Sequence, residues 1–293
     1  MTRTSGKHLI ALPEGGRIAV RAWAGYGRPL VFVHGFLDCA AGWDRLSRVT
    51  HRPCYAIDLP GFGDSTLPHE GSLVAYAGRV LYAMEALELE GVTLVGHSLG
   101  GAVARTVVDV EPDYLVDSLV LVTPAGFGRI NMAEMAAHPL VKPVLAASVP
   151  FALANPLACD LIYRLSVSGG LPASRALKLR SMRAALRGPG GARRGLEALA
   201  AISRTPTDQL LARSSFEGPV AALWGSKDRL IPREHASGVT EVFPQARVTV
   251  WPDLAHHPQE EQPERLHRYV EHAAARGRRW RQERRRQRRR TST

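Results

Sequence analysis

The chain has 293 residues, of which 45% are hydrophobic and 22% are charged. This composition is typical of a globular protein with a full-sized core, and it excludes a wholly disordered chain. The formal net charge of +11 is unevenly distributed, because residues 276–290 hold ten arginines and one glutamate and so contribute +9 of it.

The arginine-rich segment accounts for the high net charge, and the rest of the chain carries only +2. We expect residues 276–293 to form a disordered, solvated tail, a frayed extension of the last helix. An alternative is that the tail contacts nucleic acid or an anionic membrane surface. Trp280 alone is too little aromatic content to indicate stacking on bases.

The cysteines and the apolar segments indicate where in the cell the protein is expected. Cys39, Cys54 and Cys159 are odd in number and lack C-x-x-C spacing. This argues against a disulfide framework or structural zinc and predicts a cytoplasmic protein. Residues 1–12 lack a continuous apolar segment, so no secretory signal is expected. The most apolar stretch, 139–163, is interrupted by a lysine and three prolines, which argues against a transmembrane helix.

Strand-like and helix-like runs alternate along the chain, which predicts parallel βαβ units. The expected strands cover 17–23, 29–34, 54–58, 92–95, 119–122, 220–224 and 247–251, and the expected helices cover 73–90, 233–242 and 263–275. Most later strands run into a Gly- or Pro-containing loop. Because ligands bind beyond the carboxyl ends of an open parallel sheet, the functional residues are expected in these loops.

Residues 129–217 contain no convincing strand and are rich in Ala, Leu, Pro and Arg. We therefore expect two units, a core of residues 1–128 and 218–275 and a helical cap of residues 129–217. The apolar residues of the cap suggest a pocket for an apolar acyl or aromatic group, or else they only bury the cap against the sheet. They are Leu140, Val144, Phe151, Leu153, Leu157 and Leu161.

The segment Val92–Gly101 carries a G-x-S-x-G pentapeptide between a strand-like run and a helix-like run. A serine at such a strand-to-helix turn is held in a strained conformation that exposes its hydroxyl. Only very small neighbours fit this turn, which accounts for Gly96 and Gly100. Ser98 is therefore the candidate nucleophile.

A serine hydroxyl needs a base, and the base needs an anion to orient it. His256 directly follows the last expected strand and is the candidate base, whereas His257 is more suited to starting a helix or lining the entrance. Asp228 follows the strand before that and is the candidate acid. Asp253 lies too close in sequence to His256 to orient its ring.

Two backbone N–H groups should hold the oxyanion. The candidates are the amide of Leu99, next to the nucleophile, and the amide of Phe36, in the Gly-containing loop after an early strand. His34 is expected to brace that loop, and His97 to pack beside Ser98. Candidates for lining the substrate site are His34, Leu37, Trp224 and His257. The histidines and acids show no metal-binding spacing, so no metal is expected.

These motifs resemble the α/β-hydrolase fold superfamily. The matches, in the family's order, are His34-Gly35-Phe36, Asp58 to Ser65, Gly96 to Gly101, Trp224 to Asp228, and His256 with the prolines and glutamates that follow it. The resemblance implies a mostly parallel eight-stranded sheet, helices on both faces, a helical cap after the sixth strand, and a triad of Ser98, Asp228 and His256. Ala255 departs from the glycine that many relatives carry before the histidine.

The expected function is that of a cofactor-independent serine hydrolase acting on an ester or other acyl substrate, a small molecule with an acyl or aromatic group. Three alternatives remain: a C–C bond hydrolase of a ring-cleavage product, a cofactor-free haloperoxidase or perhydrolase, and a non-catalytic protein that binds a small molecule. A dehalogenase or epoxide hydrolase is disfavoured, because those relatives carry aspartate at the position of Ser98. The oligomeric state is left open.

Overall fold

The computed structural model describes residues 4–66, 71–111, 115–130, 134, 138–155, 191–205 and 207–291. Its centre is one eight-stranded sheet in the order β1-β2-β4-β3-β5-β6-β7-β8. The strands are β1 Ser5–Ala11, β2 Arg17–Trp23, β3 Leu30–Val33, β4 Cys54–Ile57, β5 Val92–His97, β6 Val116–Val122, β7 Val220–Gly225 and β8 Arg247–Trp251. β1 and β2 run antiparallel to their neighbours and the remaining pairs are parallel.

The mostly parallel eight-stranded sheet implied by the resemblance is confirmed. The residue patterns alone predicted seven of its strands and missed β1. That strand lies at the sheet edge and is largely exposed. An exposed strand needs no hydrophobic face, so it leaves no alternating pattern in the sequence.

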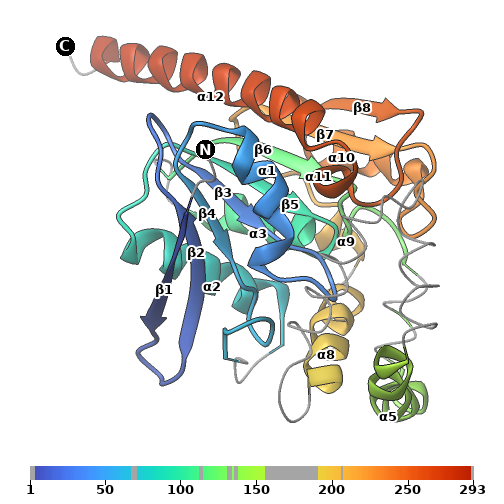
Figure 1. Cartoon of the computed structure of the whole chain (residues 1–293). Helices are drawn as coiled ribbons and strands as arrows, with labels where there is room; N and C mark the ends of the chain where they lie inside the picture. Colours follow the sequence, from blue (N-terminus) through green and yellow to red (C-terminus); the bar gives the residue numbers. More distant parts are fainter. Residues whose placement is uncertain are drawn as a thin grey trace.

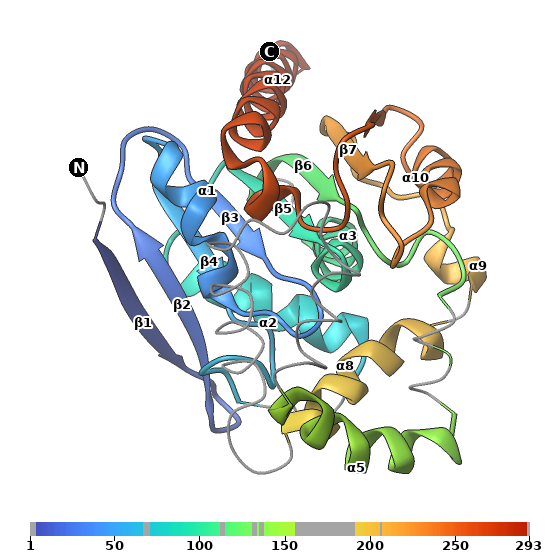
Figure 2. The ribbon, with the colours of Figure 1, turned by 45° about the vertical axis from the view of Figure 1, so that its right-hand side comes forward.

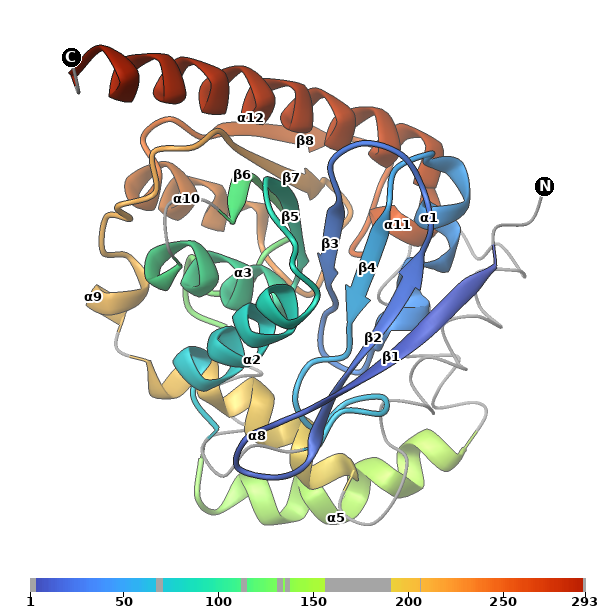
Figure 3. The ribbon, with the colours of Figure 1, turned by 90° about the vertical axis from the view of Figure 1, so that its left-hand side faces the viewer.

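Helices cover both faces of the sheet (Figures 1 and 3). One face packs against α2 (Leu73–Ala86), α3 (Leu99–Val110) and α10 (Ala236–Val242), and the other against α1 (Asp44–Val49) and α12 (Pro263–Thr291). β3 shows how this arises: Val31 and Val33 lie in the first core, and Leu30 and Phe32 in the second. Successive side chains of a strand point to opposite faces, so a strand covered on both sides is apolar throughout.

Between β6 and β7 the described residues form α5 (Val141–Ala154), α8 (Gly191–Arg204) and α9 (Thr207–Leu210), with no strand among the parts described there. α5 and α8 lie against each other at one end of the molecule (Figure 2). Leu140 and Val144 are 78% and 65% exposed. Leu157, Leu161 and the side chains of Phe151 and Leu153 lie outside the described part of the chain, and the cap remains a prediction.

Among the residues that the structure describes, the remaining short helices are η1 (Ala40–Trp43), η2 (Arg233–His235) and α11 (Pro258–Glu261). In the ranges that the structure describes, none of the helices combines the length and the apolarity that a membrane span needs.

The last helix differs from its prediction. Helix α12 extends over 29 residues to Thr291, although the sequence predicted a helix ending at 275 and a disordered tail beyond it. The first turns of the arginine-rich segment dock on the sheet: Arg281 Nε donates to Asp117 Oδ1 at 2.6 Å, and Trp280 packs against Phe216. Asp117 is distant in the sequence, so the arginines could not be distinguished from a solvated run.

Replacing Arg281 with alanine tests this docking. Asp117 is 1% exposed and also pairs with Arg28, and the Arg281 guanidinium additionally donates to the Val116 carbonyl at 3.1 Å. We expect the free energy of unfolding to fall by about 2 kcal/mol in urea titrations, because a buried carboxylate loses one of its two cationic partners. Arg279 lies in the same helix and is exposed, so Arg279→Ala should stay within about 0.5 kcal/mol. Equal values for the two variants would contradict the docking.

Candidate active site

Ser98 lies at a sharp turn between β5 and α3. Its backbone has φ 52° and ψ −120°, a strained conformation for a residue with a side chain. A Cβ atom at Gly96 would come 2.4 Å from the Gly100 carbonyl oxygen, and one at Gly100 would come 2.3 Å from that of Val33. Both glycines therefore allow backbone segments to touch, as the pentapeptide predicted. Ser98 precedes the first turn of α3, where the helix dipole is positive.

The close approach at Gly100 leads to a stability prediction. Gly100→Ala should lower the free energy of unfolding by at least about 2 kcal/mol, because its Cβ would meet rigid backbone of β3. Gly78 is an exposed residue inside α2 with open space around it, so Gly78→Ala should raise stability by about 0.5–1 kcal/mol. Urea unfolding of both variants measures this difference, and a Gly100→Ala variant as stable as the parent would contradict it.

The loop after β3 borders the turn at Ser98. A Cβ at Gly35 would lie 3.0 Å from the Ser98 Cβ, so only glycine lets this backbone come so near. His34 is fully buried and braces the loop: its Nδ1 donates to the Gly35 carbonyl at 2.8 Å and its Nε2 accepts from the Leu59 N–H at 2.9 Å. The candidate oxyanion donors thus belong to the two segments that flank Ser98, Phe36 to this loop and Leu99 to α3.

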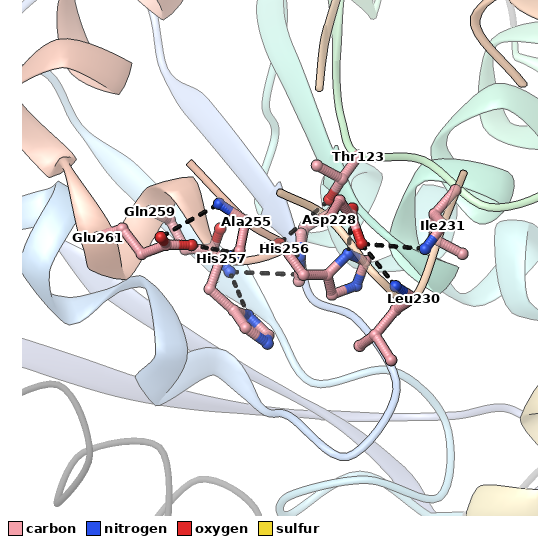
Figure 4. Close-up of polar contacts among 10 residues, drawn as sticks. Thr123, Asp228, Leu230, Ile231, Ala255, His256, His257, Gln259 and Glu261 are labelled. Carbon is pink, nitrogen blue, oxygen red and sulfur yellow. Dashed lines mark hydrogen bonds and ion pairs between the residues drawn. The ribbon is translucent and has the colours of Figure 1, made fainter. Parts of the chain in front are cut away.

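His256 and Asp228 are in direct contact. His256 Nδ1 lies 2.8 Å from Asp228 Oδ2, and both side chains are at least 95% buried (Figure 4). The other carboxylate oxygen, Oδ1, accepts from the N–H groups of Leu230 at 2.8 Å and Ile231 at 3.0 Å. With Nδ1 facing the carboxylate, Nε2 is the ring nitrogen left for other chemistry. The backbone contacts hold the carboxylate in one orientation.

Asp253 has a different environment from Asp228. Its side chain is 49% exposed and pairs with Arg265, with a further hydrogen bond from Gln262. These two interactions lower the pKa of the Asp253 carboxyl, the Gln262 hydrogen bond being the larger cause. Of the two acids that the sequence placed near His256, the structure therefore brings Asp228 to the ring and leaves Asp253 at the surface.

The backbone of His256 is fixed to the ends of two central strands. Its carbonyl accepts from His97 Nε2 at 2.7 Å and from the Thr123 hydroxyl at 3.2 Å. His97 immediately precedes Ser98, and its ring centroid lies 4.8 Å from that of His256. Within the described residues no hydrogen bond joins the Ser98 hydroxyl to the His256 ring. Such bonds are often long in unliganded enzymes and shorten when substrate binds.

A buried polar cluster beside His256 was not found from the sequence. Asp38, His97 and His257 each offer a ligand atom, these atoms lie within 4.8 Å of one another, and all three side chains are buried. The Gln259 amide nitrogen lies 3.3 Å from His97 Nδ1 and 3.4 Å from His257 Nδ1. Two histidines and a carboxylate are a possible metal set, but an N–H donor between the two rings favours hydrogen bonding over a cation.

The cluster gives His97 a definite protonation pattern. If Gln259 donates to His97 Nδ1, the proton of a neutral His97 ring lies on Nε2, the nitrogen that donates to the His256 carbonyl. In addition to the packing predicted for it, His97 therefore donates a hydrogen bond that holds the backbone of His256. The members of the cluster lie at or just beyond the carboxyl ends of three different strands, which only the folded sheet brings together.

The other candidates for lining a substrate site lie mostly in the interior. Trp224 is fully buried and its side chain belongs to the core packed against α2 and α3. His257 is 3% exposed and follows His256 directly. Leu37 is half-buried, with a positive φ of 55° in the loop beside Ser98. Of these three, Leu37 has the most exposed side chain.

Comparison with known proteins gives the family. Residues 28–263 match the family model described as alpha/beta hydrolase fold. The chain is 30% identical over 247 residues to the dihydrolipoyllysine-residue acetyltransferase component of an acetoin cleaving system from Pseudomonas putida. That match covers 83% of this chain and 62% of the relative, so the chain spans less than two thirds of that protein's length.

Two solved structures share the fold. An esterase from Thermogutta terrifontis superposes with a TM-score of 0.73 at 21% identity, covering 91% of this chain and 97% of the esterase. A bromoperoxidase from Bacillus anthracis superposes with a TM-score of 0.71 at 20% identity, covering 90% and 98%. With the family model matched over most of its length, the chain belongs to the alpha/beta hydrolase fold family.

Proposed function

We propose that the protein is a serine hydrolase that cleaves a carboxylic ester, or a related acyl substrate, through an acyl-enzyme. The observation that carries this proposal is the 2.8 Å hydrogen bond between His256 Nδ1 and a buried, oriented Asp228 carboxylate. In the same part of the fold, a strained serine precedes a helix. A histidine held by a carboxylate next to such a serine is the arrangement that acyl transfer requires.

The reaction follows from these roles. His256 Nε2 takes the proton of the Ser98 hydroxyl as Ser98 Oγ attacks the substrate carbonyl carbon. The negative charge that develops on the carbonyl oxygen is held by the N–H groups of Phe36 and Leu99. The imidazolium then gives its proton to the departing alkoxide, which leaves as an alcohol. The acyl group stays bound to Ser98 as the acyl-enzyme. Asp228 stays ionised and stabilises the imidazolium.

Water completes the cycle. His256 accepts a proton from the attacking water molecule, whose oxygen adds to the acyl carbon. When this second tetrahedral intermediate collapses, the His256 imidazolium gives the proton to Ser98 Oγ and the carboxylic acid leaves. The hydrogen bonds from His97 and Thr123 to the His256 carbonyl hold the backbone of this residue, and this limits movement of its ring between the two steps. The acetyltransferase name of the Pseudomonas relative also concerns an acyl group, which supports an acyl substrate here.

Labelling and turnover test the proposal together. A fluorophosphonate should form a covalent adduct whose peptide map places it on Ser98, and a panel of p-nitrophenyl esters from acetate to dodecanoate should show hydrolysis with a preference for chain length. The preference would identify the acyl group that fits beneath the proposed cap. Absence of both the adduct and ester turnover in folded protein would overturn the proposal and favour a binding protein.

A further inference from the structure

The arginine-rich half of α12 is not used by the proposed reaction. α11 begins two residues after His256, and α12 begins two residues after the end of α11. The 29 residues of α12, at 1.5 Å each, give a helix of about 43 Å. Its carboxyl end extends past the core on the side opposite α5 and α8 (Figures 1 and 3). A partner bound there would leave the region of α5 and α8 uncovered.

The helix is held rigidly where it leaves the core. Arg281 and Trp280 contact Asp117 and Phe216, and a Cβ at Gly277 would come 2.8 Å from the Asp117 carbonyl oxygen, so helix and strand touch. Beyond this anchor, residues 285–290 contain five arginines and one glutamine, all exposed. The arginines of residues 285–290 thus lie on the end of a helix that is anchored to the core.

The positive charge in this region is concentrated. Residues 276–290 carry a formal +9. The pKa of the Arg28 guanidinium is lowered first by burial and then by the charges of Arg285, Arg281 and Arg278. Such crowding of like charges is relieved by a polyanion, whose phosphates replace small counterions.

The distribution of charge distinguishes between the two polyanions considered for this segment. No apolar side chain occurs from Arg281 to Arg290, so this part of the helix lacks the apolar face with which helices bind at a lipid surface. At about 100° per residue, the five arginines of 285–290 spread over about 200° of the helix circumference. A flat membrane meets one side of a helix, whereas a DNA groove has phosphates on both sides and admits a helix.

We propose that the exposed end of α12 binds double-stranded DNA through its phosphate backbone, as a tether that is independent of the catalytic site. The contacts are between guanidinium groups and phosphates, which position a protein on DNA without reading its sequence. Affinity should therefore be alike for unrelated duplexes and fall steeply with salt.

Fluorescence anisotropy of a 24-base-pair duplex with the full-length chain tests the tether. With five phosphate contacts, the slope of log K against log salt should be about −4.5, which is about a 500-fold loss of affinity between 50 and 200 mM salt. Replacing Arg285, Arg286, Arg288, Arg289 and Arg290 with glutamine, a residue of similar helix propensity, should remove most of this dependence.

Two further variants distinguish DNA binding by the end of α12 from binding that depends only on the net positive charge of the protein. One removes five exposed charges elsewhere (Lys7, Arg17, Arg48, Arg213 and Arg233, each to glutamine) and should bind DNA within about threefold of the parent. The other, Gln287→Pro, keeps every arginine but breaks the helix and should lose at least about tenfold in affinity. Melting temperatures of all variants confirm folding.

Three outcomes would overturn the proposal. The first is no duplex binding at 50 mM salt. The second is equal loss of affinity in the two five-residue variants. The third is tighter binding to phosphatidylglycerol vesicles than to DNA, which would assign the helix to membranes. None of these bears on ester turnover or fluorophosphonate labelling, so the tether and the proposed hydrolase activity can fail separately.

Discussion

Ser98→Ala is expected to lower kcat for p-nitrophenyl ester hydrolysis by at least about 10⁴-fold while the protein stays folded. The turn is held by backbone contacts: the Ser98 N–H donates to the Val122 carbonyl at 3.1 Å, and the Ser98 carbonyl accepts from the N–H groups of Gly101 and Ala125. Alanine keeps all three contacts and has the same Cβ at φ 52°, so only the nucleophilic oxygen is lost.

Burst and steady-state kinetics together with thermal melts measure this effect. The melting temperature of Ser98→Ala should stay within about 3 °C of the parent, because a loss well below 1 kcal/mol is expected. Ser237, exposed on α10, is the matched control, and Ser237→Ala should keep full activity. Activity of Ser98→Ala within tenfold of the parent would assign the hydrolysis to another group.

The sequence predicted those parts of the fold whose signal is local. Leu30 to Val33 read as a strand because both faces of the sheet are covered there, and the Gly-x-Ser-x-Gly segment specified its turn because each glycine is needed at its own position. β1 left no such trace, since a largely exposed edge strand can be polar. The parts that were missed depend on partners distant in the chain.

The last helix and the buried cluster show why distant partners escape such reasoning. In the sequence, Arg281 is one arginine among many. Only its contacts with Asp117 and Val116, which lie more than 160 positions away, distinguish it from the other arginines of the segment. Asp38, His97 and His257 likewise come from distant parts of the chain: Asp38 from the loop after β3, His97 from the end of β5 and His257 from the loop after β8. A parallel sheet gathers its loops at one edge, so the sequence indicates which loops meet but not which side chains touch.

The contact between Asp228 and His256 carries the second large effect. Asp228→Asn is expected to lower kcat by about 10³ to 10⁴-fold. The reason is geometric: the N–H groups of Leu230 and Ile231 already donate to Oδ1, so the asparagine oxygen will occupy that position and its NH₂ group will face His256 Nδ1. An amide donor there requires the ring proton on Nε2, and a protonated Nε2 cannot accept the proton of Ser98.

Asp253→Asn is the matched control, because this acid lies three residues before His256 but is half-exposed and pairs with Arg265. It should keep kcat within about twofold of the parent, since exposed ion pairs contribute little. Kinetics for both variants at one pH and salt concentration, with Nδ1 and Nε2 protonation of His256 read by nitrogen NMR, test the tautomer directly. A full rate for Asp228→Asn, or a proton on Nδ1 in that variant, would show that the carboxylate does not set the state of the base, and the reaction would need a different proton acceptor.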